Sequence, residues 1–350
     1  MPKVAIIGTT TWGMTLGVVL AHKGLEVRLW ARTEEEADEL RKAGPGSVLP
    51  PDVTFPSQLS VTSSLDEALA EVKAVILAVP SQKMRQNVRL AAGYLKGSVL
   101  IVSAAKGLES GSNKRMSQVI GEEIKPRLQS NICVLSGPNL SQEIVHNLPA
   151  ATVVASWDEA AARKAQRLLT TPNLCVYTNT DVIGVELGGA LKNVIALGAG
   201  MVDGLGYGDN TKAAFITRGL TEISALGIAL GASPVTLSGL AGLGDLIATC
   251  SSRLSRNHYV GEELTKGRSL TEIIDSMAGV AEGVGTTAAA WSLAQEFGME
   301  MPIVERVYKV LYEGVEPRQV AVELMQAEVS HELAGRKWKL FSFLRPRGHP

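Results

Sequence analysis

The sequence predicts an α/β plus all-α protein, with an N-terminal domain built on a mostly parallel sheet over residues 1–180 and an all-helical domain over residues 181–328. In the first part, short runs rich in β-branched residues alternate with helical patterns, as in βαβ units around a buried sheet. After residue 180 the apolar pattern becomes helical and is interrupted by Gly-rich joints. A chain of 350 residues is also long for one hydrophobic core, so two domains are the default expectation.

The predicted strands are short and mostly apolar, and helical patterns fill most of the gaps between them. They cover residues 4–7, 27–30, 74–79, 99–103, 132–135, 152–155 and 174–177. The helix after the second strand is the best marked. Thr33 and Glu36 form a predicted capping box, acids fill the first turn, and Gly44 ends the helix.

Composition favours a soluble protein that does not bind nucleic acid. The chain is 45% hydrophobic and 20% charged, with a formal net charge of -1. Its three cysteines, Cys133, Cys175 and Cys250, are widely separated and odd in number, which suits a reducing compartment and provides no disulfide framework. A strand predicted from residue 4 leaves no room for a signal peptide, so we expect a cytoplasmic protein. The five histidines show no metal-ligand spacing, and no metal is expected.

A glycine-containing loop follows the first predicted strand and opens a helix. Gly8 and Gly13 flank it in the sequence GTTTWG. In this context the first glycine permits a tight turn, the last allows helix and strand to pack closely, and amides at the helix start face a pyrophosphate. Thr10 replaces the middle glycine, so its Cβ is an obstacle and its hydroxyl a candidate donor to phosphate. The loop predicts a dinucleotide-binding, Rossmann-like domain.

The end of the second predicted strand indicates which dinucleotide is bound. NAD enzymes usually place an acid about 20 residues past the first glycine, where it holds the ribose hydroxyls. Here the chain reads Trp30-Ala31-Arg32, and the arginine suits a 2′-phosphate. NADPH/NADP is therefore slightly favoured over NADH/NAD as the cofactor. The alternative leaves Arg32 exposed at the start of an acidic helix.

Lys192 lies in an apolar run, residues 185–202, in which only it and Glu186 carry charge. A helix that is apolar on all sides is normally buried. A buried ammonium must find a partner or lose its proton, and either outcome makes it a candidate for proton transfer. The alternative is a lysine that extends from the helix edge to solvent. The run is long enough for a membrane span, but its glycines and two charges favour a close-packed core helix.

Polar residues follow two of the predicted strands on the side where open α/β sheets bind ligands. Lys106 follows the fourth predicted strand, and the segment Ser136-Gly137-Pro138-Asn139 follows the fifth. Both segments should face one crevice outside the carboxyl ends of the strands. A lysine in such a place suits a polar or anionic small substrate.

Two further candidates lie in the predicted helical half. Asp245 ends a Gly-rich turn, either as the partner that a buried Lys192 requires or merely as a helix cap. Ser255, Arg256 and Asn257 form a predicted helix start, where backbone amides and a guanidinium together suit a phosphate.

The last segment, residues 329–350, interleaves basic and aromatic residues. Such a composition binds anionic membrane surfaces, usually with the help of a second signal, so weak membrane-surface contact is one option for this tail. A terminal extension that is disordered or docks on its own protein is the commoner case.

Seven motifs occur in order along the chain: KGLE from Lys106, SGP from Ser136, LPAAT from Leu148, VELGGALKN from Val185, GLGDL from Gly242, SRN from Ser255 and AEG from Ala281. As a set they resemble the motifs of bacterial-type NAD(P)-dependent glycerol-3-phosphate dehydrogenases. The resemblance covers residues 3–328 and implies a Rossmann-like domain, an all-helical domain and usually a cytoplasmic homodimer. It also implies reduction of dihydroxyacetone phosphate to sn-glycerol 3-phosphate, the entry to glycerophospholipid synthesis.

The resemblance also implies roles for individual residues. Lys192 is implied to transfer the proton, Lys106 to orient the substrate and Asp245 to complete the catalytic set. Further implied substrate contacts are Gly137, Asn139, Asn193, Thr249, Ser255, Arg256 and Asn257. Implied cofactor contacts are Thr11, Trp12, Arg32, Ser141, Val280 and Glu282, with Lys106 and Arg256 nearby. The glycine loop described above adds Gly8, Thr10 and Gly13 to the predicted cofactor contacts. Two residues depart from the family pattern, since Thr10 is usually glycine and Asn139 is commonly serine or threonine.

Two alternatives share this layout. Another small-acid dehydrogenase, such as a hydroxyacid or ketopantoate-type reductase, has the same order of elements, but Arg256 and Asn257 favour a phosphorylated substrate. A nucleotide-sensing module without turnover would fit the altered glycine loop. The presence of Lys106, Lys192 and Asp245 argues against it, because function depends on the site more than on the fold.

Overall fold

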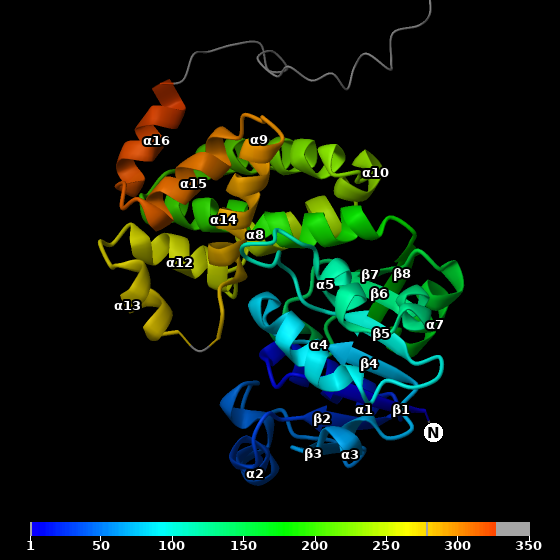
Figure 1. Cartoon of the computed structure of the whole chain (residues 1–350). Coiled ribbons are helices and arrows are strands. Elements are labelled where there is room, and N and C mark those ends of the chain that lie inside the picture. Colours follow the sequence, from blue (N-terminus) through cyan, green and yellow to red (C-terminus); the bar gives the residue numbers. More distant parts are fainter. Residues whose placement is uncertain (1, 278, 327–350) are drawn as a thin grey trace, which may run out of the picture.

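The computed structural model describes residues 2–277 and 279–326, which form a sheet-based half and a helical half (Figure 1). The sheet has eight strands in the order β3-β2-β1-β4-β5-β6-β7-β8. Their bounds are β1 Lys3–Ile7, β2 Glu26–Trp30, β3 Leu59–Thr62, β4 Ala74–Leu77, β5 Leu100–Ser103, β6 Ile132–Ser136, β7 Ala150–Ala155 and β8 Leu174–Asn179. Of the pairings between these strands, β6–β7 is antiparallel and the others are parallel. The predicted mostly parallel sheet is confirmed.

Strand β3 is absent from the strands that the sequence predicts. It pairs in parallel with β2 and lies at the edge of the sheet. Leu59 and Thr62 are buried, whereas Ser60 is exposed. A four-residue strand with two hydroxyl side chains carries too little apolar pattern to be recognised, so its pairing with β2 decides its conformation.

Helices cover both faces of the sheet. Successive strand residues point to opposite faces, so Ile6 and Ile76 pack in one apolar cluster with α1, while Ile7 and Leu77 pack in another with α4 and α5. The α-helices of this half are α1 Thr11–His22, α2 Glu34–Ala43, α3 Leu65–Leu69, α4 Met84–Ala92, α5 Met116–Glu123, α6 Ser141–Val145 and α7 Glu159–Leu169.

Helix α2 shows only half of the predicted capping box. The Thr33 side-chain oxygen accepts a hydrogen bond from the backbone N–H of Glu36 at 3.2 Å, and Gly44, with φ +64°, follows the last helical residue as predicted. The reciprocal half of the capping box, in which the Glu36 carboxylate would accept from the backbone N–H of Thr33, is wrong. The Glu36 carboxylate accepts instead from the backbone N–H of Arg32 at 2.9 Å and from the hydroxyl of Thr9. The acid is thus drawn away from its own helix to the loop after β1.

Helix α8, Val182–Gly204, runs through the core of the helical half, and α9, α11, α12 and α14 pack around it. By length and composition it is the one helix of the described chain that could cross a membrane, but 89% of its most apolar window is buried in the protein. The predicted close-packed core helix is confirmed. Glycine makes the packing close, since a Cβ on Gly261 of α12 would lie 1.9 Å from the Leu197 carbonyl oxygen of α8.

The helical half continues to the end of the described residues. Its other helices are α9 Asp209–Ala229, α10 Pro234–Leu237, α11 Asp245–Ser251, α12 Arg256–Leu264, α13 Leu270–Asp275, α14 Glu282–Glu296, α15 Pro302–Tyr312 and α16 Pro317–Gln326. Strand β8 ends at Asn179 and α8 begins at Val182, and we place the proposed domain boundary in this link. The basic and aromatic tail, residues 329–350, lies outside the described residues.

Candidate active site

The candidate site lies where loops at the carboxyl ends of the strands meet the helical half. The loop after β1 carries Gly8, the loop after β5 carries Lys106, and the loop after β6 carries Asn139. Ligands of open α/β sheets bind at this edge. An ion pair between Lys106 and Asp245 of α11 shows that the helical half closes over it.

Asp245 is bound by two lysines that come from different halves of the molecule. On α8, Lys192 Nζ donates to Oδ1 of Asp245 and, at 2.5 Å, to Oγ1 of Thr249. On the loop after β5, Lys106 Nζ donates to Oδ2 of Asp245 and to the carbonyl oxygen of Gly137, both at 2.7 Å. The side chains of Lys192 and Asp245 are 7% and 1% exposed, so the alternative that Lys192 extends to solvent is wrong.

Asp245 is placed by a π-helical turn, Leu240–Gly244, that leads directly into α11. The alternative that Asp245 merely caps this helix is wrong, because its two carboxylate oxygens bind two ammonium groups. A Cβ on Gly188 of α8 would lie 2.6 Å from the carbonyl oxygen of Ala241 in the turn. Glycine at this position therefore lets α8 lie against the turn and brings Lys192 to Asp245.

Burial sets the protonation of Lys106. Removal from water lowers the pKa of its ammonium to about 8, while the negative charge of Asp245 raises it and the positive charge of Lys192 lowers it. With one carboxylate between two amines, the cluster carries a net positive charge when both amines are protonated. Positive charge in a site shielded from water suits an anionic substrate or a developing oxyanion.

The loop that carries Lys106 is held by Gln82, which lies just before α4. The Gln82 side-chain amide donates to the carbonyl oxygen of Leu108 at 2.7 Å, and its oxygen accepts from the backbone N–H of Ser110 at 2.9 Å. Two hydrogen bonds from one planar amide fix the loop backbone just beyond Lys106.

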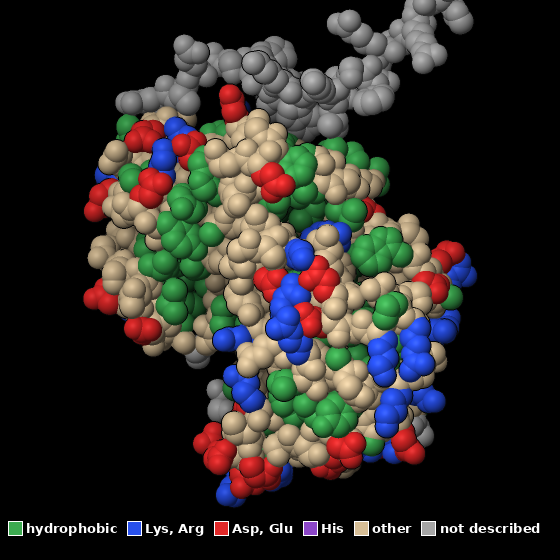
Figure 2. Space-filling model, viewed as in Figure 1, with side chains coloured by type: hydrophobic (Ala, Val, Ile, Leu, Met, Phe, Trp, Pro, Cys, Tyr) green, Lys and Arg blue, Asp and Glu red, His purple; other side chains and the backbone are tan. Residues whose placement is uncertain are grey.

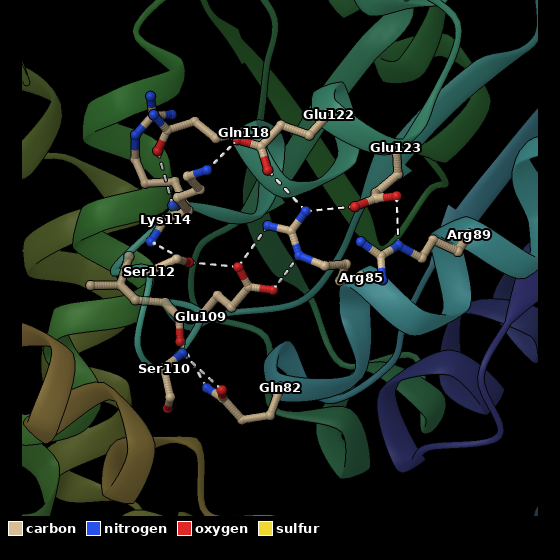
Figure 3. A network of polar contacts seen from close by, with 12 residues as sticks. Gln82, Arg85, Arg89, Glu109, Ser110, Ser112, Lys114, Gln118, Glu122 and Glu123 are labelled. Atoms are coloured by element: carbon tan, nitrogen blue, oxygen red, sulfur yellow. Dashed lines mark hydrogen bonds and ion pairs between the residues drawn. The ribbon is translucent and has the colours of Figure 1, made fainter.

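An ion-pair network extends this support to α4 and α5 (Figure 3). Arg85 binds both carboxylate oxygens of Glu109, at 2.8 and 2.7 Å. The network also includes Arg89, Lys114, Glu122 and Glu123. In the space-filling view it accounts for the mixed-charge cluster over α4 and α5 (Figure 2). Because the bidentate pair lies three residues beyond Lys106, it limits how far that loop can move.

Helix α12 begins where the sequence predicts, and its first turn joins three helices. Ser255 is the N-cap and accepts from the backbone N–H of His258 at 3.2 Å. The Asn257 side chain donates to the side-chain oxygen of Asn193 on α8 at 2.8 Å and accepts from the backbone N–H of Gly283 on α14 at 2.9 Å. Asn193 and Asn257 are therefore both engaged in fixing the turn that carries Arg256.

Arg256 projects from this turn with its charge unneutralised by direct contact. Its guanidinium packs against Gly279, where a Cβ would lie 2.5 Å from Nη1. The surrounding protein lowers the pKa of Arg256, and the carboxylate of Glu282 raises it. The side chain as a whole is exposed, and its guanidinium forms no hydrogen bond or ion pair within residues 2–277 and 279–326. It is thus available to an incoming anion.

The loop after β1 has the tight geometry of a phosphate-binding turn. Gly8 has φ +114°, and a Cβ there would lie 2.6 Å from the carbonyl oxygen of Ala78. Thr10 caps α1, since its hydroxyl oxygen accepts from the N–H of Gly13 at 3.1 Å and donates to the Ala78 carbonyl at 2.7 Å. The predicted use of this hydroxyl as a donor to phosphate is therefore wrong, because its one hydrogen is already donated.

Buried polar atoms beside this loop lack partners. Within the described residues, Trp12 Nε1 and both polar side-chain atoms of Asn139 have no hydrogen-bond partner. Trp12 lies in the first turn of α1, and Asn139 precedes α6, which packs against α1. Such atoms are costly to bury unless a ligand or water satisfies them. Together with the Gly8 turn, they fit a bound dinucleotide and a polar substrate.

The other implied cofactor residues lie around the same edge. Thr11 begins α1, Ser141 begins α6, and Arg32 and Val280 are exposed. The carboxylate of Glu282 accepts from the backbone N–H of Ser81 at 2.9 Å and from its hydroxyl, which ties α14 to the loop after β4. Burial raises the pKa of Glu282, and these hydrogen bonds oppose the shift.

Sequence reasoning missed Ser81 and Gln82 as site residues. Both follow β4, and the rule that identified Lys106 after β5 applies to that strand end as well. Glu282, the partner of Ser81, lies far away in the chain. Gln82 binds the backbone carbonyl oxygen of Leu108, a contact that leaves no side-chain signal in the sequence. Only the fold therefore reveals these contacts.

The fold, with its sheet-based half and helical half, and the site at the strand ends are those of a dinucleotide-dependent oxidoreductase. The family profile described as NAD-dependent glycerol-3-phosphate dehydrogenase N-terminus matches residues 3–162, and its C-terminal counterpart matches residues 181–322. A glycerol-3-phosphate dehydrogenase [NAD(P)+] of Dehalococcoides mccartyi is 62% identical over 348 residues, which cover 99% of this chain and 97% of that one. The chain belongs to the NAD-dependent glycerol-3-phosphate dehydrogenase family.

Solved structures agree with this assignment. The glycerol-3-phosphate dehydrogenase of Coxiella burnetii superposes with a TM-score of 0.88 at 35% identity, covering 93% of this chain and 99% of that chain. A ketopantoate reductase of Ralstonia eutropha has a TM-score of 0.57 at 14% identity and shares the fold alone. Neither the ketopantoate-type reductase nor the nucleotide sensor is favoured as an alternative.

Proposed function

We propose that the chain reduces dihydroxyacetone phosphate to sn-glycerol 3-phosphate with NADPH or NADH. The observation that carries the proposal is the bridge that Asp245 forms between Lys106 and Lys192 across the two halves. It supplies paired ammonium groups at the strand edge where the substrate's carbonyl would lie. Family membership supplies the substrate, since the relatives are glycerol-3-phosphate dehydrogenases.

The chemistry assigned to this chain's residues is charge stabilisation followed by protonation. When bound, the nicotinamide cofactor supplies the hydride that reduces the carbonyl carbon. The carbonyl oxygen gains negative charge and then needs a proton. Lys192 has three N–H donors, of which Asp245 and Thr249 take two, and it gives the third proton to that oxygen. Its amine then recovers a proton from solvent.

Lys106 orients the same substrate. Asp245 and Gly137 take two of its three donors, which leaves one for the substrate. Its pKa of about 8 keeps most of the ammonium charged at neutral pH and allows it to titrate within the alkaline range.

The phosphate of the substrate is assigned to the first turn of α12. Arg256 supplies an unneutralised guanidinium, and the backbone amides at the helix start add partial positive charge. Ser255 and Asn257 shape this turn through the capping and side-chain hydrogen bonds described above.

The cofactor is assigned to the loop after β1 and its surroundings. Gly8, Gly13 and the first turn of α1 would hold the pyrophosphate, with Thr11 and Trp12 in that turn. Arg32 would meet a 2′-phosphate, which favours NADPH slightly. Ser141, Val280 and Glu282 complete the proposed cofactor contacts.

The wider setting is also a proposal. We place the enzyme in the cytoplasm, as a homodimer that supplies sn-glycerol 3-phosphate for glycerophospholipid synthesis. Cys133, Cys175 and Cys250 are free thiols, which suits a reducing compartment. The tail at 329–350 adds weak membrane-surface contact by its basic and aromatic composition.

The decisive test follows NADPH oxidation with dihydroxyacetone phosphate, unphosphorylated dihydroxyacetone and ketopantoate in parallel. We expect turnover of the phosphorylated triose, little of dihydroxyacetone and none of ketopantoate. Retained NADPH binding without turnover of any of the three would overturn the proposal and favour the nucleotide sensor.

Arg256→Ala should weaken binding of the phosphorylated substrate by about 2–4 kcal/mol, because a charge-assisted contact is lost. The measurement is KM for dihydroxyacetone phosphate, with Arg253→Ala, an exposed neighbouring arginine, as the control. An equal loss with unphosphorylated dihydroxyacetone would mean that Arg256 supports structure and not the phosphate.

A further inference from the structure

The carboxylate of Glu36 joins two loops at the end of the fold where the adenosine of a dinucleotide binds. It accepts from the hydroxyl of Thr9, in the loop after β1, and from the backbone N–H of Arg32, just after β2, at 2.9 Å. Strands β1 and β2 are paired neighbours, with Ile7 opposite Trp30. In Rossmann-like folds the adenosine ribose lies between these two strand ends.

Local helix chemistry does not explain this position. A glutamate three residues after a threonine N-cap ordinarily returns its side chain to the backbone N–H of that cap residue. Thr33 caps the N–H of Glu36, but the Glu36 carboxylate extends past Thr33 to Arg32 and Thr9. The side chain is half-buried, whereas Glu34 and Glu35 of the same turn are exposed.

Arg32 supplies the opposite charge at the same place. Its side chain is exposed, and its guanidinium forms no hydrogen bond or ion pair with any of residues 2–277 and 279–326. An acid at this end of a Rossmann-like fold holds the 2′-hydroxyl of NAD, whereas an arginine accommodates the 2′-phosphate of NADP. This chain has both an arginine, Arg32, and an acid, Glu36, at this end of the fold.

We propose that Glu36 is a specificity-determining residue for the cofactor, an inference that rests on the proposed function. Its carboxylate has about four acceptor positions, of which Thr9 and Arg32 occupy two, so it accepts the 2′-hydroxyl of NADH as well. The same negative charge repels the 2′-phosphate that Arg32 attracts. Attraction by one residue and repulsion by the other leave the chain able to use both cofactors.

Equilibrium binding of NADPH and NADH to the full-length protein, measured by calorimetry without substrate, tests this inference. Glu36→Gln keeps the size of the side chain but removes its charge. Its amide oxygen can still accept from the backbone N–H of Arg32, and its amide group can donate to the Thr9 hydroxyl oxygen, so both loops stay joined. NADPH should bind roughly tenfold more tightly and NADH a few-fold more weakly, as expected when one charge-assisted contact changes. The gain for NADPH should shrink at high salt, because screening weakens charge repulsion.

Two further variants complete the design. Glu35→Gln removes a charge from the same turn at an exposed position and should leave both dissociation constants unchanged. Arg32→Ala should act in the opposite sense to Glu36→Gln and lower the NADPH/NADH preference roughly 10- to 100-fold.

The outcomes separate this inference from the proposed function. If Glu36→Gln weakens both cofactors equally, the carboxylate only holds the two loops together and the inference is overturned, while the function stands. If the unmodified protein binds neither cofactor, the proposed function itself fails.

Discussion

Lys106, Lys192 and Asp245 depend on one another for their charge. Lys192 alone would be a costly buried cation, Lys106 a partly buried one, and Asp245 alone a costly buried anion. Together the two lysines share the carboxylate of Asp245. Lys192 donates a second hydrogen bond to Thr249, and Lys106 donates a second one to the carbonyl oxygen of Gly137. Each ammonium then retains one free donor, which is what a reaction at a carbonyl oxygen needs.

Lys192→Met should fold and bind NADPH but lose at least ~10²-fold in kcat, the lower bound for a general acid–base group. Folding should survive because Lys106 still neutralises Asp245. Steady-state kinetics and NADPH titration measure the two effects, with the exposed Lys164→Met as the control. Near-normal kcat in the folded variant would remove Lys192 from the chemistry.

The pH profile of kcat/KM should reveal Lys106. Its pKa is lowered to about 8, so its charged form, and with it substrate binding, declines as pH rises through that value. The substrate phosphate titrates near roughly pH 6 and does not account for this alkaline limb. In Asp245→Asn the lost negative charge lowers the pKa of Lys106 further, and the decline should begin at lower pH. A limb that stays in place would assign it to another group.

Glycine residues determine how closely the helices of the helical half pack against one another. Helix α12 lies against α8 because Gly261 has no side chain where Leu197 presents its carbonyl oxygen. Since α12 carries Arg256 and α8 carries Lys192, this crossing also sets the distance between the proposed phosphate site and the proposed proton donor.

Gly261→Ala should lower the free energy of unfolding by about 1–3 kcal/mol, as expected for overpacking. The added Cβ would lie 1.9 Å from backbone oxygen, which cannot rotate away, so α12 must shift. Urea unfolding and KM for dihydroxyacetone phosphate report the two consequences. Gly93→Ala is the matched control, because that glycine has φ -66° and open space around it. Equal stability of the two variants would contradict the packing argument.

Across the whole molecule, polar contacts fasten the sheet-based half to the helical half. Lys106 binds Asp245, Ser81 binds Glu282, and Arg115 at the start of α5 binds Glu186 on α8 at 2.6 Å. Burial raises the pKa of Glu186, and Arg115 opposes the shift. The candidate active site is therefore complete only while these contacts hold the halves together.

Arg115→Met should cost about 3–5 kcal/mol at pH 8, because it leaves a buried carboxylate without its cation. The loss of Arg115 raises the pKa of Glu186 further above its unfolded value. The variant is then most stable at a pH below the pKa that Glu186 has in the unfolded chain. It loses stability as the pH rises through the pKa that Glu186 has in the folded protein. Urea unfolding should show a smaller deficit at pH 5 than at pH 8, and adding Glu186→Gln should recover much of it. A deficit independent of pH would mean that Arg115 acts through packing, for example on Trp157.

The sequence by itself determined the class of fold, most of the strands and the chemical character of the site. Strand and helix periodicity, the Gly8 turn and the start of α12 are local signals, because they depend on backbone geometry within a few residues. An ammonium in an apolar helix is likewise visible in the sequence, since its burial and its need for a partner follow from its neighbours.

Only the tertiary structure decided which partners those groups have. In the folded protein both lysines bind Asp245, and the Thr10 hydroxyl donates to the carbonyl oxygen of Ala78. The Glu36 carboxylate binds outside its own helix, at the loop after β1, and β3 pairs at the edge of the sheet. Each of these contacts either joins residues that are distant in the chain or selects one of several hydrogen-bond partners that the local sequence does not distinguish. Hydrogen bonds and ion pairs are made with whatever the fold brings within reach, and that distance is a property of the packed molecule.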